Sequence, residues 1–308
     1  MSTPATPARP PAPVPSAAVH EHQVGEVRLT SLVDVAGSFP APFPAPFTGM
    51  TEAQWSTVRR DHPLSLGDGH WTATVRATLI SSPGATVLVD TGIGSRERDY
   101  ARALDTSGRL PDLLAALGTD PDDIDIVVIT HPHADHVGWN LTTPAPDAPA
   151  TPTFPSARYL LHHDAWSGAL AESEHPFQGL RYFEENIAPL TALGVADLVD
   201  GDAVLAPGIS LMDTPGHAPG HVVVHVQSCD EHALIVGDAA VHPLQLTLTH
   251  AGFFADTDPS VAATTRETLV ERALDLDAVI TGAHFPGSGF GRLHRHAHDR
   301  VVWHDLAV

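Results

Sequence analysis

The chain has 308 residues, 43% of them apolar, enough to bury a sizeable core as one large domain or two small ones. Its 37 acidic residues outnumber 16 basic ones, and the formal net charge of −21 disfavours a nucleic-acid partner. No apolar run of about 18 residues is present to cross a membrane, and the single cysteine, Cys229, excludes an internal disulfide and a zinc site built from cysteines.

The first 22 residues are rich in Pro, Ala, Ser and Thr. We expect residues 1–22 to form a disordered tail, because such a segment cannot bury enough apolar surface to order itself. The tail lacks an apolar stretch of about 7–15 residues, which disfavours a secretory signal and favours the cytoplasm. Residues 23–308 are then expected to form one domain.

A Pro- and Phe-rich stretch follows at residues 37–47. We expect it to be irregular, because proline removes backbone donors. Its phenylalanines, Phe39, Phe43 and Phe47, either cap a pocket or anchor the loop to the core.

The rest of the chain alternates short apolar runs with turn signals and helical stretches. The hairpin turn Ser82-Pro83-Gly84 joins two of the predicted strands. Helices are predicted at residues 110–117, at 163–172 and from the N-cap Asp258 to Leu274. Strands are predicted at residues 27–35, 74–81, 85–90, 124–130, 159–162, 209–213, 222–226, 233–236 and 278–281. Strands with interspersed helices and hairpins predict a layered α/β sandwich.

The chain contains 21 histidines, and several follow directly after predicted strands. The strand at residues 124–130 runs into the motif His-Pro-His-Ala-Asp-His at 131–136. Residues i and i+2 of an extended segment point the same way, so His131 and His133 can hold one cation. A turn would then direct Asp135 and His136 toward a second cation.

Three further strands end in a glycine turn followed by a residue that can bind metal. These residues are His217, Asp238 and His284. Ligands of α/β folds collect where strand ends meet at one rim of a sheet, so the four segments predict a dinuclear site.

The ligand types divide into two sets with one residue between them. The first set is His131, His133 and His217. The second set is Asp135, His136 and His284. We expect Asp238 to bridge two zinc ions, with other divalent metals accepted, because imidazole and carboxylate suit such metals. Two cations roughly 3.5–4 Å apart can share a bridging water and lower its pKa. Asp135 and Asp238 are the expected catalytic carboxylates, and Asp135 would also orient the nucleophilic water.

The segments HPHADHVG, TPGHAPGH, GD at 237–238 and GAHFP resemble the metallo-β-lactamase superfamily, from about Val24 to the C-terminus. The resemblance implies a four-layer αββα sandwich with the site at one edge. It also implies that Asp90, in Leu-Val-Asp-Thr-Gly at 88–92, supports the ligands from behind. GDAAVHPLQ, the DPS segment with its helix, and GAHFPGSGFGRL are most similar to the methyl parathion hydrolase-like branch, which includes lactonases and esterases.

Two departures from relatives bear on the substrate. Asp238 stands where classical metallo-β-lactamases have a cysteine, which disfavours a β-lactamase. Lactonases of acyl-homoserine lactones typically carry an active-site tyrosine, whereas Ala239, Ala240 and Val241 follow Asp238, which disfavours a tyrosine-stabilised oxyanion.

Four residues near the ligands are further candidates. We expect His221 to support a ligand from behind, and His242 either to face the substrate or to be a buried support. Trp139 and Phe285 lie within three residues of a ligand and are candidates for an apolar pocket wall.

The leading hypothesis is a dinuclear zinc hydrolase of a small apolar ester or lactone that uses a metal-bridging hydroxide. Phosphotriester hydrolysis by the same hydroxide is the alternative. An iron-dependent redox enzyme of the same fold is less favoured, because no flavodoxin-like extension is present. A nuclease is disfavoured by the negative charge. The expected partner is a small molecule, with a homodimer left open.

Overall fold

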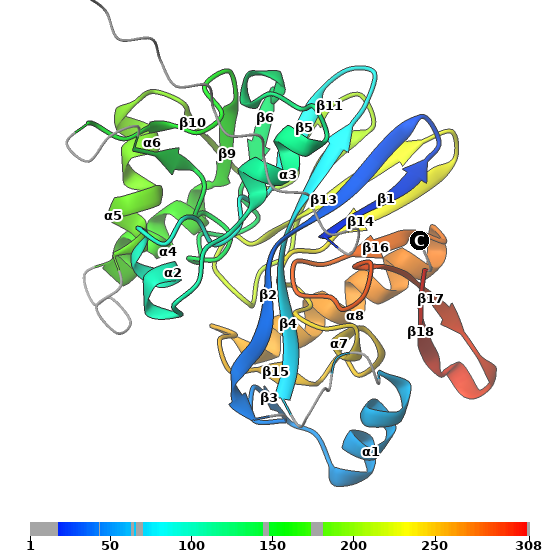
Figure 1. The fold of residues 1–308 in the computed structure, drawn as a ribbon. Helices are drawn as coiled ribbons and strands as arrows, with labels where there is room; N and C mark the ends of the chain where they lie inside the picture. Colours follow the sequence, from blue (N-terminus) through cyan, green and yellow to red (C-terminus); the bar gives the residue numbers. More distant parts are fainter. Residues whose placement is uncertain are drawn as a thin grey trace, which may run out of the picture.

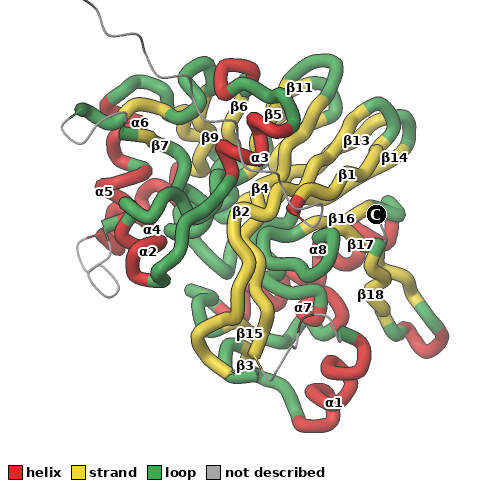
Figure 2. The backbone as a smooth tube through the Cα atoms, viewed as in Figure 1, coloured by secondary structure: helices red, strands yellow, loops and turns green. Residues whose placement is uncertain are grey.

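The computed structural model describes residues 18–42, 44–62, 65, 70–143, 148–173 and 181–306. Two seven-stranded sheets face each other and carry helices on their outer sides, as Figure 1 and Figure 2 show. This arrangement confirms the four-layer αββα sandwich. Within the described ranges, no helix has the length and apolar character needed to span a membrane.

The first sheet has the strand order β1-β2-β4-β5-β6-β9-β10. Its strands are β1 (Val19–Val24), β2 (Val27–Pro42), β4 (His70–Ser81), β5 (Thr86–Val89), β6 (Ile126–Val128), β9 (Arg158–His162) and β10 (Ala196–Val199). Helices lie on its outer side (Figure 1). They are α2 (Asp99–Ala103), α3 (Leu110–Ala116), α4 (His163–Ser173), α5 (Tyr182–Asn186) and α6 (Ala188–Ala192). Leu113, Leu161 and Phe183 belong to the apolar core that joins helices and sheet.

The second sheet has the strand order β11-β12-β13-β14-β16-β17-β18. Its strands are β11 (Val204–Ala206), β12 (Ile209–Asp213), β13 (Val222–Ser228), β14 (Glu231–Ile235), β16 (Val279–Thr281), β17 (Phe290–Arg295) and β18 (Val301–Asp305). Helix α8 (Pro259–Asp275) covers its outer face through Leu269 and Val270, and begins at the predicted N-cap Asp258. Between the sheets, side chains such as Val89 and Val128 pack against Val224 and Ile235, so the inner faces are sealed and polar chemistry is confined to the rim.

Strands β2 and β4 continue beyond the sheet as a long two-stranded ribbon (Figure 1). At its end lie α1 (Glu52–Asp61), α7 (Leu244–Thr247) and the strand pair β3 (Phe47–Thr48) and β15 (Gly252–Phe253). Phe47, Trp55, Trp71 and Phe253 pack there in one aromatic cluster. The short pair β7 (Leu141–Thr142) and β8 (Thr151–Pro152), with the 3₁₀ turns Pro121–Asp123 and Ala297–Asp299, completes the described elements.

Every predicted strand and helix is present, with ends displaced by a few residues and with β2 and β4 longer than expected. The tail expected for residues 1–22 differs from the structure, because residues 19–22 belong to β1 and pair with β2. This pairing gives a polar segment the backbone partners that its composition does not reveal. Residues 1–17 lie outside the described residues.

The expectation of an irregular segment at residues 37–47 is wrong for its first part, because residues 37–42 belong to β2. The pairing with β4 is interrupted between Ser38 and Pro42. Strand β1 accompanies β2 only as far as Leu32. Proline is tolerated at such an edge, where its missing N–H breaks no shared ladder bond. Phe47 anchors the segment in the aromatic cluster, whereas Phe43 and the side chain of Phe39 lie outside the described residues.

Candidate metal centre

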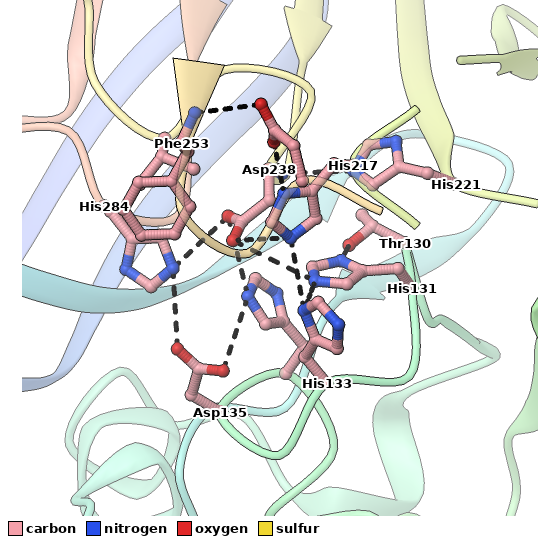
Figure 3. A network of polar contacts seen from close by, with 12 residues as sticks. Thr130, His131, His133, Asp135, His217, His221, Asp238, Phe253 and His284 are labelled. Atoms are coloured by element: carbon pink, nitrogen blue, oxygen red, sulfur yellow. Dashed lines mark hydrogen bonds and ion pairs between the residues drawn. The ribbon is translucent and has the colours of Figure 1, made fainter. Parts of the chain in front are cut away.

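The strand ends that carry the predicted ligands meet at one rim of the sandwich. Strands β5 and β6 are parallel neighbours in the first sheet, as are β14 and β16 in the second. A hydrogen bond from Val222 N to Thr130 O (3.0 Å) joins the two sheets at this rim. The structure brings all seven predicted ligand residues together here, in the network that Figure 3 shows. They are His131, His133, Asp135, His136, His217, Asp238 and His284.

Three imidazoles converge in one group. His133 Nδ1 lies 2.9 Å from His131 Nε2 and 3.2 Å from His217 Nε2. His217 Nδ1 lies 3.0 Å from a carboxylate oxygen of Asp256, so Nδ1 carries the proton and Nε2 keeps a lone pair. Thr130 donates its hydroxyl to a carboxylate and therefore accepts from His131 Nδ1 at 3.1 Å, which leaves a lone pair on His131 Nε2 as well. Converging lone pairs are the arrangement that a metal ion satisfies.

Asp135, His136 and His284 form the second group. Asp135 Oδ2 lies 3.5 Å from His284 Nε2, and Asp135 Oδ1 lies 3.9 Å from His136 Nε2. His136 Nδ1 donates to Asp90 Oδ2 at 2.8 Å. His284 Nδ1 donates to the carbonyl oxygen of Thr74 at 2.5 Å. In both rings the outward nitrogen holds the proton and Nε2 faces Asp135.

Asp238 lies between the two groups and presents one oxygen to each. Its Oδ2 lies 3.5 Å from His217 Nε2 and 3.9 Å from His131 Nε2. Its Oδ1 lies 3.2 Å from His284 Nε2 and 3.6 Å from His136 Nε2. This is the geometry of a carboxylate that can bridge two cations.

Two buried atoms of this network have no hydrogen-bond partner, and they test whether a metal fits. They are His136 Nε2 and Asp238 Oδ1. Buried polar atoms without a partner are rare in folded proteins, because each costs about 1–3 kcal/mol. The two atoms lie 3.6 Å apart where Asp238 faces the second group, so the donor set fits a metal cation at this position.

The pKa values indicate where the site needs positive charge. Burial lowers the pKa of His133 to about 3 and that of His131 well below its usual range, so both are neutral ligands. Burial also acts against charge on His136 and His284, but the nearby carboxylates, chiefly Asp238 and with it Asp135 and, for His136, Asp90, together outweigh burial and raise both pKa values. The same two imidazoles hold the pKa of Asp238 well below its usual range although burial raises it. The negative charge of the buried carboxylates therefore favours a cation beside Asp238.

Asp90 lies behind the ligands, as the family resemblance implies. It accepts from His136 Nδ1, and Thr130 donates both its backbone N–H and its hydroxyl to it. His221 also supports the site, because its Nε2 accepts from the backbone N–H of Asp238 at 3.1 Å. Gly237 permits this approach: its φ is +49°, and a Cβ there would lie 2.9 Å from His221 Nε2 and from Thr130 Oγ1.

Sequence reasoning missed Asp256, the carboxylate behind His217. It lies 39 residues from His217 in a loop before α8, and no spacing rule links the two positions.

The remaining candidates lie at the edge of the site or in the core. His242 is fully buried and its Nε2 lies 2.9 Å from Ser65 Oγ, so it is the buried support of the two roles left open. Half-buried Trp139 donates its indole N–H to Asp34 at 3.1 Å. Phe285 does not fit the expectation of a pocket wall, because its ring is fully buried under α8 and packs edge-on against Trp303. Strand β16 ends at Thr281, and the turn after it directs the Phe285 ring into the core.

A tyrosine does lie near the site, on an element that sequence reasoning did not consider. The pKa of Tyr100, on α2, is raised by the negative charge of Asp135, by burial and by the charge of Asp238. The phenol is therefore within electrostatic reach of both carboxylates.

The comparisons with known proteins agree with this geometry. A family model described as the metallo-beta-lactamase superfamily matches residues 72–284, a range that contains all seven candidate ligands. The chain is 23% identical over 211 residues to the N-acyl homoserine lactonase AiiA of Bacillus thuringiensis subsp. kurstaki, which covers 63% of this chain and 74% of that protein. It is 30% identical over 189 residues to the N-acyl homoserine lactonase AiiB of Agrobacterium fabrum, and this match covers 54% of this chain and 62% of that protein.

Two solved structures share the fold over nearly the whole chain. One is AbOPH, described as a hydrolase in the beta lactamase superfamily, with a TM-score of 0.79, 21% identity and coverage of 96% of this chain and 99% of that one. The other is AidC, described as a dizinc quorum-quenching lactonase, with a TM-score of 0.74, 20% identity and coverage of 94% and 98%.

Proposed function

Because the chain belongs to the metallo-beta-lactamase superfamily, we propose that it is a dinuclear zinc-dependent hydrolase of a small apolar ester or lactone. The observation that carries the proposal is Asp238, whose two oxygens face two separate groups of ligand side chains. One ion would be held by His131, His133 and His217. The other would be held by Asp135, His136 and His284. Similarity to N-acyl homoserine lactonases supports a lactone as the substrate.

The residues divide the work of hydrolysis between them. When bound, the metal pair lowers the pKa of a water molecule and polarises the substrate carbonyl. Asp135 is the most exposed candidate carboxylate ligand, with 20% of its side chain accessible against 6% for Asp238, so it can contact the attacking water. We assign to it the orientation of that water and the transfer of its proton to the departing alcohol oxygen. The buried Asp238 and the histidines stay fixed.

Aromatic side chains next to the ligands favour an apolar substrate. The ring of Phe253 lies 6.2 Å from that of His217. Phe254, 59% exposed, packs against Phe253 at 4.7 Å. An apolar wall beside a polar reaction centre is typical of sites for small acyl compounds.

The decisive experiment measures metal content and substrate preference together. We expect about two zinc ions per purified chain and the highest kcat/KM on an N-acyl homoserine lactone or an aryl ester in a panel that includes a phosphotriester. Asp238→Asn should lose metal and at least about 10³-fold in kcat/KM. Asp122→Asn, an exposed change of the same kind, should lose neither.

Full activity in metal-stripped protein would overturn the proposal. Preference for the phosphotriester would select the alternative function, and one iron per chain would select redox chemistry. Membership of the methyl parathion hydrolase-like branch, a single folded domain and a cytoplasmic location stay predictions, and a homodimer stays open.

A further inference from the structure

A second buried carboxylate lies behind the three-imidazole group. Asp256 Oδ1 lies 3.0 Å from His217 Nδ1, and the two side chains are 0% and 1% exposed. The other oxygen, Oδ2, accepts from the backbone N–H of Phe253 at 2.9 Å. Figure 3 shows Phe253 and His217 on this side of the network. With one oxygen fixed by the backbone, the other holds His217 with Nε2 directed inward.

A buried arginine completes this arrangement. Arg266, on α8, lies with Nη1 3.4 Å from Asp256 Oδ2, and both side chains are 0% exposed. Its Nε donates to the carbonyl oxygen of Thr249 at 2.9 Å. A buried carboxylate with no nearby cation is costly, so the guanidinium offsets the charge that Asp256 brings next to the site.

The backbone ties the same two segments together. Thr257 N donates to His217 O at 3.0 Å, and Asp258 N donates to Gly216 O at 2.8 Å. Gly216 has φ +128°, and a Cβ there would lie 2.3 Å from Ala262 N, so the loop that carries His217 rests directly on α8. Helix α8 thus positions this loop through main chain and side chain together.

The other candidate ligands have different partners behind them. His136 also faces a carboxylate, Asp90, whereas His131 faces the hydroxyl of Thr130 and His284 faces a carbonyl oxygen. Each of the two groups therefore contains one histidine with a carboxylate behind it. Asp256 contacts His217 of the three-imidazole group, whereas Asp90 contacts His136 directly and also holds Thr130, which lies behind His131.

We propose that Asp256, held by Arg266, is the positioning residue for the metal ion of the three-imidazole group. The inference rests on the proposed two-metal site. Partners behind a ligand histidine fix its tautomer and orientation, and losing one typically costs about 10–100-fold in metal affinity. Because Asp256 touches only His217 among the seven candidate ligands, its loss acts on one ion and spares the other.

The test is zinc affinity, measured by competition with a chromophoric chelator, together with the visible absorption of the Co²⁺-loaded protein. Asp256→Asn should lower the affinity for one of the two zinc ions about 10–100-fold and alter only part of the Co²⁺ spectrum. Asp90→Asn removes the carboxylate behind His136 and also disturbs Thr130 behind His131, so it should weaken the binding of both ions, in contrast to Asp256→Asn. Asp275→Asn, an exposed change on α8, should alter neither.

Asp256→Asn leaves Arg266 buried without its carboxylate, and the variant can fail to fold for that reason alone. The double variant Asp256→Asn with Arg266→Met removes both charges and should fold, as circular dichroism would report, while showing the same selective loss of one zinc ion. Unchanged affinities in the folded Asp256 variants, or equal weakening of the binding of both ions in them, would overturn the assignment. If the wild-type protein binds fewer than two metal ions, the proposed function itself fails, so the two failures are distinguishable.

Discussion

At the scale of single residues, the candidate site depends on which ring nitrogen of each ligand histidine carries the proton, as well as on which residues are present. Each ligand histidine with a described outer partner donates its outward nitrogen to a carboxylate, a hydroxyl or a carbonyl oxygen. The inward nitrogen therefore keeps its lone pair. Without these partners, the same residues would sample other tautomers and ring orientations.

Gly237 illustrates how tightly the backbone is constrained beside Asp238. Gly237→Ala should lower the free energy of unfolding by about 2–3 kcal/mol and weaken zinc binding, because it combines a positive φ with crowding against His221 and Thr130. Gly118→Ala is the matched control, with φ +74° and nothing within 4 Å of the added Cβ. Gly118→Ala should lower the free energy of unfolding by about 1 kcal/mol and leave zinc affinity unchanged. Urea unfolding and zinc competition measure the two effects, and equal losses in both variants would contradict the prediction.

Asp34, which is not one of the candidate metal ligands, should make the free energy of unfolding depend on pH. Its buried carboxylate accepts from the backbone N–H groups of Ile93, Arg109 and Leu110 and from the indole of Trp139. Burial nevertheless raises its pKa from 3.8 to about 6, against the opposing effect of these donors. The folded state then binds the proton more tightly than the unfolded state. The stabilisation that Asp34 contributes to folding is therefore complete below about pH 4 and is lost as the pH rises through 6.

The measurement compares the wild type with Asp34→Asn by urea unfolding at pH 4 and pH 7. We expect the free energy of unfolding of the wild type to fall relative to the variant by on the order of 3 kcal/mol across this range. Parallel pH profiles would show that the carboxyl group does not titrate there.

At the scale of elements, the site is held by segments far from it in sequence. Strand β4 fixes the loop after β16: Thr74 O accepts from His284 Nδ1, while Arg76 donates to the carbonyl oxygens of Phe285 and Gly287 at 3.1 and 2.7 Å. Burial lowers the pKa of Arg76 to about 10, and its partners are carbonyl and hydroxyl oxygens. This guanidinium therefore works as a set of donors that shapes the loop behind His284.

Arg76→Met should lower the free energy of unfolding by about 3 kcal/mol and reduce zinc occupancy, because it leaves buried carbonyl groups without donors. Arg28→Met removes an exposed arginine whose Nη1 lies 3.9 Å from Glu21, and should cost less than about 1 kcal/mol with full zinc content. Thermal unfolding and elemental analysis of both variants check this, and full zinc occupancy in Arg76→Met would contradict it.

At the scale of the whole molecule, the two sheets are joined at the rim by groups that need a cation. Four carboxylates, Asp90, Asp135, Asp238 and Asp256, lie in or directly behind the network. Metal binding therefore couples the two halves of the sandwich, and binding free energy becomes folding free energy.

Removal of metal with a chelator should lower the unfolding temperature by roughly 5–10 °C, since a tightly bound ion stabilises by about 4 kcal/mol. Calorimetry on the stripped and zinc-restored protein measures the difference. An unfolding temperature that does not respond to zinc would contradict the coupling.

The sequence by itself determined the layered α/β class, the predicted strands and helices to within a few residues apart from the longer β2 and β4, and the seven ligand candidates, while the four layers came from the family resemblance. Apolar periodicity indicates which side chains are buried, and a glycine with a His or Asp after it at the end of a strand indicates a potential metal ligand at that end. Residues 131–136 are local in the chain, so their geometry follows from an extended segment and a turn.

Only the tertiary structure decided which groups lie behind the ligands and which side chains face the site. Asp256 contacts His217, and Arg76 donates to the loop after His284, although these residues are far apart in the chain. The pKa of Tyr100 is likewise raised by the charge of Asp135. The edge position of residues 37–42 and the inward turn of the Phe285 ring were likewise set by neighbours. Local pattern cannot specify these contacts, because their partners are chosen by how sheets and helices pack and not by spacing along the chain.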